Sequence, residues 1–211
     1  MKGAVVYLWR NTMNEPIWVN YHKHTSLSNK WLKDSPLLPI DYWNELKARY
    51  GDKPCIYTTV EHGWAGNYFK QYDDLEKFNK KNSTNIRWIY GAEAYWVKNR
   101  HESDRSNCHI VLLARTDKGR KAINKILSIA NKDGYYARPR IDLELIDQLP
   151  PDDVMITTAC IAFWNKYDDI DDIIGECDVV IDFSTVELSM KVLKSCIRAG
   201  KAYICGTTGF S

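Results

Sequence analysis

The stretch His109-Ile110-Val111-Leu112-Leu113-Ala114 indicates the fold class of this chain most directly. After its first residue it is continuously apolar, which is typical of a strand buried on both faces of a parallel sheet. Apolar residues then recur at helical spacing and form one stripe, at Ile123, Ile126, Leu127 and Ala130. A buried strand followed by an amphipathic helix predicts an α/β fold with a parallel sheet or barrel.

The same alternation extends in both directions from this stretch. Segments rich in β-branched and aromatic residues predict further strands at 17–21, 56–60, 86–90 and 154–156. Between them we expect a helix over Tyr42–Tyr50, capped by Asp41 and ended by Gly51, and a second helix around Tyr72–Asn79. The first 16 residues fit no part of this pattern and stay unassigned.

The last 37 residues, 175–211, change character and predict a single Rossmann-like βαβ unit. Asp178–Phe183 is an apolar strand, and Ser184 and Glu187 have the spacing of a capping box. A helix should then run to Ala199 and end at Gly200, before a strand over 202–205 and a turn over 206–209. The acidic stretch Asp168–Asp172 is the candidate boundary, so we predict one domain over 17–174 and a fragment over 175–211.

Composition excludes several classes of protein. The chain has 211 residues with 29 Lys and Arg against 27 Asp and Glu, so its net charge of +2 gives no broad electrostatic footprint for nucleic acid. No apolar run approaches the roughly 20 residues of a membrane span, and the first residues lack a signal-peptide core, so we expect a cytoplasmic protein without membrane contact. The six cysteines are too widely spaced for a CxxC motif and predict reduced thiols.

A pair of histidines gives the sharpest local signal for chemistry. His22 and His24 lie at i and i+2, and on a strand such side chains project from the same face and can bind one metal ion. The alternative is a pair of exposed, solvated histidines at a strand end.

Other metal-ligating residue types follow predicted strands, where α/β folds gather their sites. His62 comes after the second strand, Glu93 after the third, Cys160 after residues 154–156, and His109 lies at the edge of the most buried strand. For Glu93 the alternative is a surface carboxylate, and for Cys160 an inert buried thiol. Imidazole, carboxylate and thiolate together suit Zn, Mn or Fe rather than Mg alone.

Six motifs in a fixed order resemble the PHP (polymerase and histidinol phosphatase) domain of the bacterial and phage DNA polymerase III alpha subunit, over about residues 17–174. These motifs are Trp18–Thr25, Glu61-His62-Gly63, Gly91–Tyr95, His109–Ala114, Gly134–Arg140 and Thr158-Ala159-Cys160. The resemblance implies a distorted β/α barrel whose strand ends hold a metal cluster. It implies seven ligands, His22, His24, Asp34, His62, Glu93, His109 and Cys160. Glu61 stands where many members carry Asp, and we leave it out of the ligand set.

This resemblance also implies an activity, the metal-dependent hydrolysis of a phosphoester or of pyrophosphate. The substrate would then be a phosphate compound such as a DNA 3′ end or pyrophosphate, and replication proteins would be partners. Arg140 would either pair with a phosphate through its planar fork or form a structural salt bridge. Some members are metal-free, so a non-catalytic module with the same fold is the alternative.

The resemblance breaks after Cys160, because the late Asp-x-His motif that supplies the last ligands is absent and no histidine follows. We therefore expect an incomplete barrel and an incomplete metal cluster. No polymerase palm or fingers region is present, so we do not expect polymerisation by this chain.

The C-terminal residues resemble a different family, the nucleotide-binding domain of dihydrodipicolinate reductase, an enzyme of lysine biosynthesis. The resemblance lies in Asp178–Ser184 and Ile204–Ser211, and it implies that Gly206, Thr207 and Thr208 touch a nicotinamide cofactor. The family's glycine-rich phosphate loop is missing, so we expect neither NAD(P) binding nor reductase activity. The chain is then either a recombined product with two incomplete domains, or a fold in which the terminal βαβ unit closes the barrel.

Overall fold

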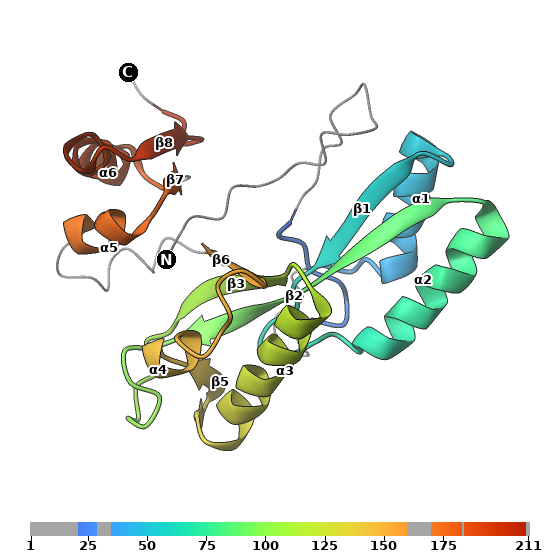
Figure 1. The fold of residues 1–211 in the computed structure, drawn as a ribbon, viewed down its shortest axis with the longest axis horizontal. Coiled ribbons are helices and arrows are strands. Elements are labelled where there is room, and N and C mark those ends of the chain that lie inside the picture. Colours follow the sequence, from blue (N-terminus) through green and yellow to red (C-terminus); the bar gives the residue numbers. More distant parts are fainter. Residues whose placement is uncertain (1–20, 29–34, 160–169, 183, 210–211) are drawn as a thin grey trace. The chain divides into compact units, whose positions relative to one another are not determined.

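The computed structural model describes residues 21–28, 35–159, 170–182 and 184–209 (Figure 1). They form two compact units, and Ala159 is the last residue of the first. Residues 17–20 of the strand predicted over 17–21 lie outside the described residues, as do two predicted metal ligands, Asp34 and Cys160. The predicted boundary at Asp168–Asp172 remains a prediction, and within it the second unit's first helix, α5 (Ile170–Glu176), begins.

The described residues of the first unit form a mixed sheet of six strands. The strands are β1 (Pro54–Thr59), β2 (Asn85–Trp96), β3 (Cys108–Ala114), β4 (Tyr135–Tyr136), β5 (Arg138–Ile141) and β6 (Val154–Thr158). Their order is β4-β5-β2-β3-β6, with β1 paired to the other half of β2. β2 joins the sheet together because Asn85–Tyr90 pair with β1 and Gly91–Trp96 pair with β3.

Strand direction corrects one prediction. The apolar run in β3 was expected in a parallel sheet, but β3 is antiparallel to both of its neighbours, β2 and β6. Parallel pairing occurs in β1 with β2 and in β2 with β5. Burial on both faces therefore arises from layers on both sides of the strand and does not require parallel neighbours. The mixed α/β class is confirmed, and the incomplete barrel stays a prediction.

Within the described part of this unit, four helices accompany the sheet, α1 (Pro39–Tyr50), α2 (Tyr68–Asn82), α3 (Asp117–Lys132) and α4 (Leu143–Ile146). The apolar stripe predicted for α3 is buried in full. Thr116 caps α3 by accepting a hydrogen bond from the Gly119 backbone N–H. A Cβ atom at residue 119 would overlap the carbonyl oxygen of Asp153, so glycine is required for α3 to approach the chain before β6 this closely.

The start of α1 also differs from its prediction. Asp41 does not precede the helix but lies in its first turn, where its carboxylate accepts a hydrogen bond from the Leu38 backbone N–H at 2.7 Å. Pro39 starts the helix because its fixed φ suits the first turn and its missing N–H is not needed there. Gly51 ends the helix at a positive φ of 60°, as predicted.

The second unit contains α5, β7 (Val179–Asp182), α6 (Val186–Ala199) and β8 (Ala202–Cys205). β7 and β8 are parallel and α6 connects them, as the sequence predicted. Thr185, not Ser184, caps α6 with its side-chain oxygen, one residue later than the expected capping box. Gly200 ends α6 in the left-handed conformation. Residues 206–209 follow β8 without the predicted turn assignment.

Strand pairing bears on the idea that this unit closes a barrel. Among the described strands, β7 and β8 pair with each other and form a two-stranded sheet of their own. None of the described helices has the length and apolarity needed to cross a membrane.

Candidate metal centre

Four histidines converge on one buried carboxylate in the first unit. The Oε2 atom of Glu93 lies 3.1 Å from His22 Nε2, 2.9 Å from His24 Nε2 and 3.6 Å from His62 Nδ1. The Oε1 atom of the same carboxylate lies 2.7 Å from His109 Nδ1. Five of the seven predicted ligands are therefore brought together, with each of the four histidines in contact with Glu93, and we call these five residues the Glu93 cluster.

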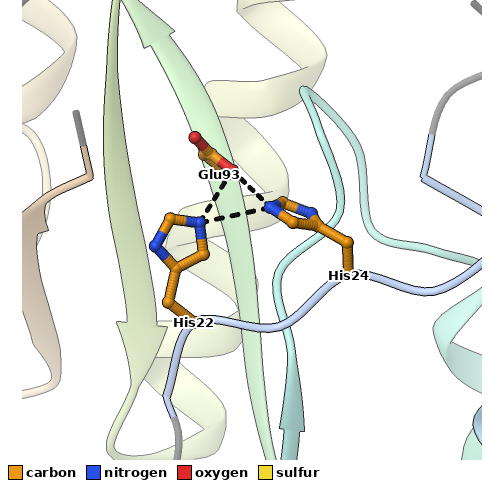
Figure 2. A group of neighbouring side chains, drawn as sticks. All are labelled: His22, His24 and Glu93. Carbon is orange, nitrogen blue, oxygen red and sulfur yellow. Dashed lines mark hydrogen bonds and ion pairs between the residues drawn. The ribbon is translucent and has the colours of Figure 1, made fainter. Parts of the chain in front are cut away.

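The backbone elements differ from those that the sequence predicted. His22 and His24 lie in an irregular segment rather than on a strand, and Figure 2 shows both imidazoles directed at Glu93. Glu93 lies within β2, not after its end, because β2 runs on to Trp96. His62 pairs with Glu93 through an isolated parallel bridge beyond the end of β1, and His109 is the second residue of β3.

Neighbouring hydrogen bonds hold the irregular histidine segment in place. The Lys23 carbonyl accepts from the Val60 backbone N–H at 2.8 Å, and the His24 carbonyl accepts from the Tyr42 hydroxyl at 2.8 Å. Lys23 itself points away from the cluster, with its ammonium 5.1 Å from the Tyr42 ring centre and 5.5 Å from that of Tyr57. The side chains of His22 and His24 thus contact Glu93 and that of Lys23 does not, as expected for a strand, although the segment is not a regular strand.

Two residues that the sequence did not single out support the cluster. Thr25 donates its hydroxyl to Glu61 at 2.7 Å and its backbone N–H to the same carboxylate at 3.2 Å. The Ser28 hydroxyl lies 3.3 Å from His24 Nδ1 and accepts from the His62 backbone N–H at 3.1 Å. The sequence feature that could have identified Thr25 and Ser28 is their position shortly after the His22-Lys23-His24 motif. Partners on the second ring nitrogen of a metal-binding histidine fix its tautomer and orientation.

Glu61 takes a different part from Glu93 although both carboxylates are buried. Burial raises the pKa of Glu61, and its hydrogen bonds from Thr25 and Ser28 offset this only in part. Burial also acts to raise the pKa of Glu93, but hydrogen bonds from His109, His22 and His24 and the charge of His62 outweigh it, so this pKa lies well below its usual range. Glu93 is thus the anionic centre of the cluster, and Glu61 anchors Thr25.

The donor set fits a divalent transition metal. Imidazole nitrogens and a carboxylate oxygen are ligands of Zn, Mn and Fe. A tetrahedral zinc site with bonds of about 2.0–2.1 Å places its ligand atoms about 3.3–3.4 Å apart. His22 Nε2 and His24 Nε2 are 3.2 Å apart, and each lies 3.1 or 2.9 Å from Glu93 Oε2, which is close to that spacing. Among the residues that the structure describes, two groups meet the distance requirement for an ion, His22 with His24 and Glu93, and His62 with Glu93 and His109.

Arg140 has a structural role and does not reach toward a phosphate. Its guanidinium donates hydrogen bonds to four backbone carbonyls, those of Gly134, Glu102, Asp104 and Arg100, at 2.6–2.9 Å. The residue is 2% exposed. The structural alternative is therefore the one that the structure supports, with the carbonyls of Gly134 and of the 100–104 segment in place of the carboxylate of the predicted salt bridge.

Comparison with known proteins finds two kinds of relative. DNA polymerase III subunit alpha of Aquifex aeolicus is 31% identical over 156 residues, which is 68% of this chain and 12% of that protein. The same subunit of Borreliella burgdorferi is 30% identical over 109 residues, or 49% of this chain and 9% of that protein. This chain thus spans about a tenth of the length of these relatives.

The C-terminal part matches another family. The model of the family described as dihydrodipicolinate reductase, N-terminus, matches residues 152–211. The 4-hydroxy-tetrahydrodipicolinate reductase of Geobacter metallireducens is 43% identical over 44 residues, which is 21% of this chain and 16% of that protein. The chain is therefore similar to DNA polymerase III subunit alpha over about two thirds of its residues and to the N-terminal region of dihydrodipicolinate reductase over its C-terminal part.

Proposed function

We propose that the Glu93 cluster binds divalent metal ions and hydrolyses phosphoesters. The observation that carries this proposal is the approach of three imidazole nitrogens, from His22, His24 and His62, to one oxygen of a buried glutamate. Such a convergence concentrates lone pairs and one negative charge at a single point, which is the arrangement that a cation requires.

Each side chain has a distinct task in this proposal. His22 and His24 would hold one ion with Glu93, while His62 and His109 would hold a second with the same carboxylate. A bound divalent ion supplies a Lewis acid for a phosphate oxygen and makes coordinated water more acidic. His22 is the most exposed member, with 39% of its side chain accessible, so we place the substrate on its side of the cluster.

Similarity to DNA polymerase III subunit alpha supports a nucleic acid as the source of the phosphoester. We propose the 3′ end of a DNA strand as the substrate class, with pyrophosphate as the alternative, and replication proteins as partners. A metal-binding module without hydrolytic activity is the competing proposal, favoured by the absence of any histidine after His109 in the sequence.

Elemental analysis combined with a hydrolysis assay tests this proposal. We expect purified protein to carry Zn, Mn or Fe and to hydrolyse bis-p-nitrophenyl phosphate or to shorten a 3′-labelled oligonucleotide. The double variant H22A/H24A should lose both the metal and the hydrolysis. His101→Ala is the matched control, because His101 is exposed and lies outside the cluster.

The outcomes separate the competing functions. Hydrolysis that persists in H22A/H24A, or protein that never binds metal, would remove the proposed function. Bound metal without hydrolysis of either substrate would favour the non-catalytic module. A parallel titration with NADPH addresses the reductase-like part, for which we expect no binding because the sequence lacks a glycine-rich phosphate loop.

A further inference from the structure

A cavity of about 240 Å³ lies beside β2, between the starts of α2 and α3. Its lining includes three aromatic and three charged side chains, Tyr68, Trp88, Tyr90, Arg115, Asp117 and Arg120. Trp88 and Tyr90 occupy even positions of β2 and Glu93 an odd one, so they project from the opposite face of the strand. The cavity is therefore separate from the Glu93 cluster.

The aromatic rings form a connected surface. Tyr68 lies 5.0 Å from Trp88 and 4.8 Å from Tyr90 between ring centres. The hydroxyl of Tyr90 donates a hydrogen bond to Asn124 on α3, which fixes that ring. Tyr68 and Trp88 are only partly buried, and both line the cavity.

This aromatic surface continues along α2 beyond the cavity. Phe69 is 75% exposed and Tyr72 is 46% exposed. Their ring centres lie 5.4 and 5.9 Å from that of Tyr68. Three neighbouring rings on one helix are more than one ligand ring can cover, which indicates an extended partner.

The charge around the cavity is positive. Arg120 and Lys121 both pair with Asp117, which compensates the one carboxylate of the lining. The Arg120 guanidinium also lies 5.4 Å from the Tyr68 ring centre. Arg115 adds a second, exposed guanidinium. The nearby acids of α2, Asp73 and Asp74, are paired with Lys77 and Lys70.

We propose that this cavity and the adjoining aromatic residues of α2 bind single-stranded nucleic acid. A base would stack on Tyr68 and Trp88, Arg115 would pair with a neighbouring phosphate, and Phe69 and Tyr72 would contact the next bases. Aromatic faces beside cationic groups are the general means of binding single strands, because every base has a π-face. In a duplex these faces are stacked inside the helix and inaccessible.

The lining argues against an amphipathic helix as the occupant. Grooves that bind the apolar face of a helix are predominantly hydrophobic. Among the described residues that line this cavity, the only aliphatic side chain is the methyl group of Ala114. Tyrosine, tryptophan and arginine instead provide stacking and charge.

Fluorescence anisotropy with a labelled dT 12-mer tests this inference on the full chain. EDTA is present throughout, and the H22A/H24A variant is measured alongside. Binding of the 12-mer at the cavity can then be distinguished from any effect of the metal centre. We expect binding to the 12-mer, weaker binding to thymidine monophosphate, and little binding to a duplex or to an abasic 12-mer of equal charge. The abasic strand retains the phosphates and removes the bases, so it isolates stacking.

Substitutions identify the surface. Tyr68→Leu should weaken binding about 5- to 100-fold, because it keeps an apolar side chain but removes the stacking face, while Tyr68→Phe should retain it. Arg115→Ala should weaken binding and reduce the salt dependence by about one phosphate contact. Lys125→Ala is the matched control, since Lys125 is exposed on α3 and does not line the cavity.

Phe69→Ala provides a variant whose folding is not at risk, because this side chain is already 75% exposed. It should weaken binding of the 12-mer more than that of the monophosphate. Equal binding of the abasic strand, unchanged affinity in both Y68L and F69A, or failure to bind the 12-mer at all would overturn the proposal. If the chain does not bind the 12-mer but does bind metal, the nucleic-acid proposal fails while the proposed metal-dependent function is unaffected.

Discussion

β3 in the first unit and β7 in the second are both short apolar strands, yet they are buried to different extents. In β3 the four residues from Ile110 to Leu113 are each at most 2% exposed. In β7 burial alternates, with Val180 at 3% but Val179 at 47% and Ile181 at 54%. Similar local sequences have thus produced a two-sided core in one unit and a one-sided core in the other.

The difference follows from the number of neighbours that each strand has. β3 lies between β2 and β6, and Val111 and Leu113 pack with Val60 in a core cluster. β7 pairs with β8, and its buried side packs on residues of α5 and α6. A two-stranded sheet with one helical layer leaves one face without a layer among the described residues. An apolar strand therefore becomes a core strand only when the fold supplies strands and layers on both sides.

Among the substitutions that compare the two units, removal of Arg140 should lower stability the most. Its side chain connects backbone segments of the first unit that are distant in the sequence. Arg140→Met would remove four hydrogen bonds to backbone carbonyls, two of them buried and two partly buried, which we expect to cost at least about 3 kcal/mol. Peptide-resolved hydrogen exchange across a urea series measures this separately for each unit. The control is Arg115→Met, at an exposed arginine. A cost below about 1 kcal/mol would show that this network does not stabilise the first unit.

The same substitution in the two units tests the comparison most directly. Ile123→Ala removes a fully buried side chain of α3 and should cost about 2–5 kcal/mol. Ile181→Ala removes a half-exposed side chain of β7 and should cost no more than about 0.5 kcal/mol. Hydrogen exchange of α3 and of β7 peptides reports each change. An equally large cost for Ile181→Ala would mean that the apolar face of β7 is covered in solution.

Substitution of Asp182 should change stability less than substitution of Arg140 or Ile123 does, and the change should depend on pH. Its buried carboxylate accepts hydrogen bonds from the Ser184 backbone N–H at 2.8 Å and from the Tyr203 hydroxyl at 2.7 Å. Burial acts to raise the pKa of Asp182, but the hydrogen bonds outweigh it and the net pKa is lowered. The folded state thus binds this proton more weakly than the unfolded state does.

The sign of the dependence follows from this lowered pKa. The carboxylate stabilises the second unit above the unfolded pKa of about 3.9, and this stabilisation is lost as the pH falls through the lower folded value. Asp182→Asn should cost about 1 kcal/mol at pH 7 and make the second unit less sensitive to acid below about pH 4. Asp178→Asn, at an exposed carboxylate, is the control. Identical acid unfolding of D182N and the unaltered chain would contradict the assignment.

Patterns of residue type predicted much of the local structure. The stripe of Ile123, Ile126, Leu127 and Ala130 is buried, and Gly51 and Gly200 end the helices where the sequence placed those ends. The ordered histidine motifs also selected five residues that the structure brings together, while Asp34 and Cys160 lie outside the described residues. Their role as metal ligands remains a prediction.

Other predictions failed where the outcome depends on distant parts of the chain. Helix starts shifted by one or more residues, because Pro39 and Thr185 satisfy the first turns better than the predicted caps. Glu93 lies inside a long strand, and Arg140 donates to four carbonyls, three of them about 40 residues away along the chain. No local pattern contains such partners.

By itself the sequence determined which residues are apolar, where the four longer helices form, and which chemically active side chains belong together, because these follow from side-chain type and spacing. Only the tertiary structure decided that β3 runs antiparallel to its neighbours, that Arg140 is structural and that β7 has an exposed apolar face. Strand direction and burial depend on which neighbours the whole fold supplies, and a strand's own residues are compatible with more than one arrangement.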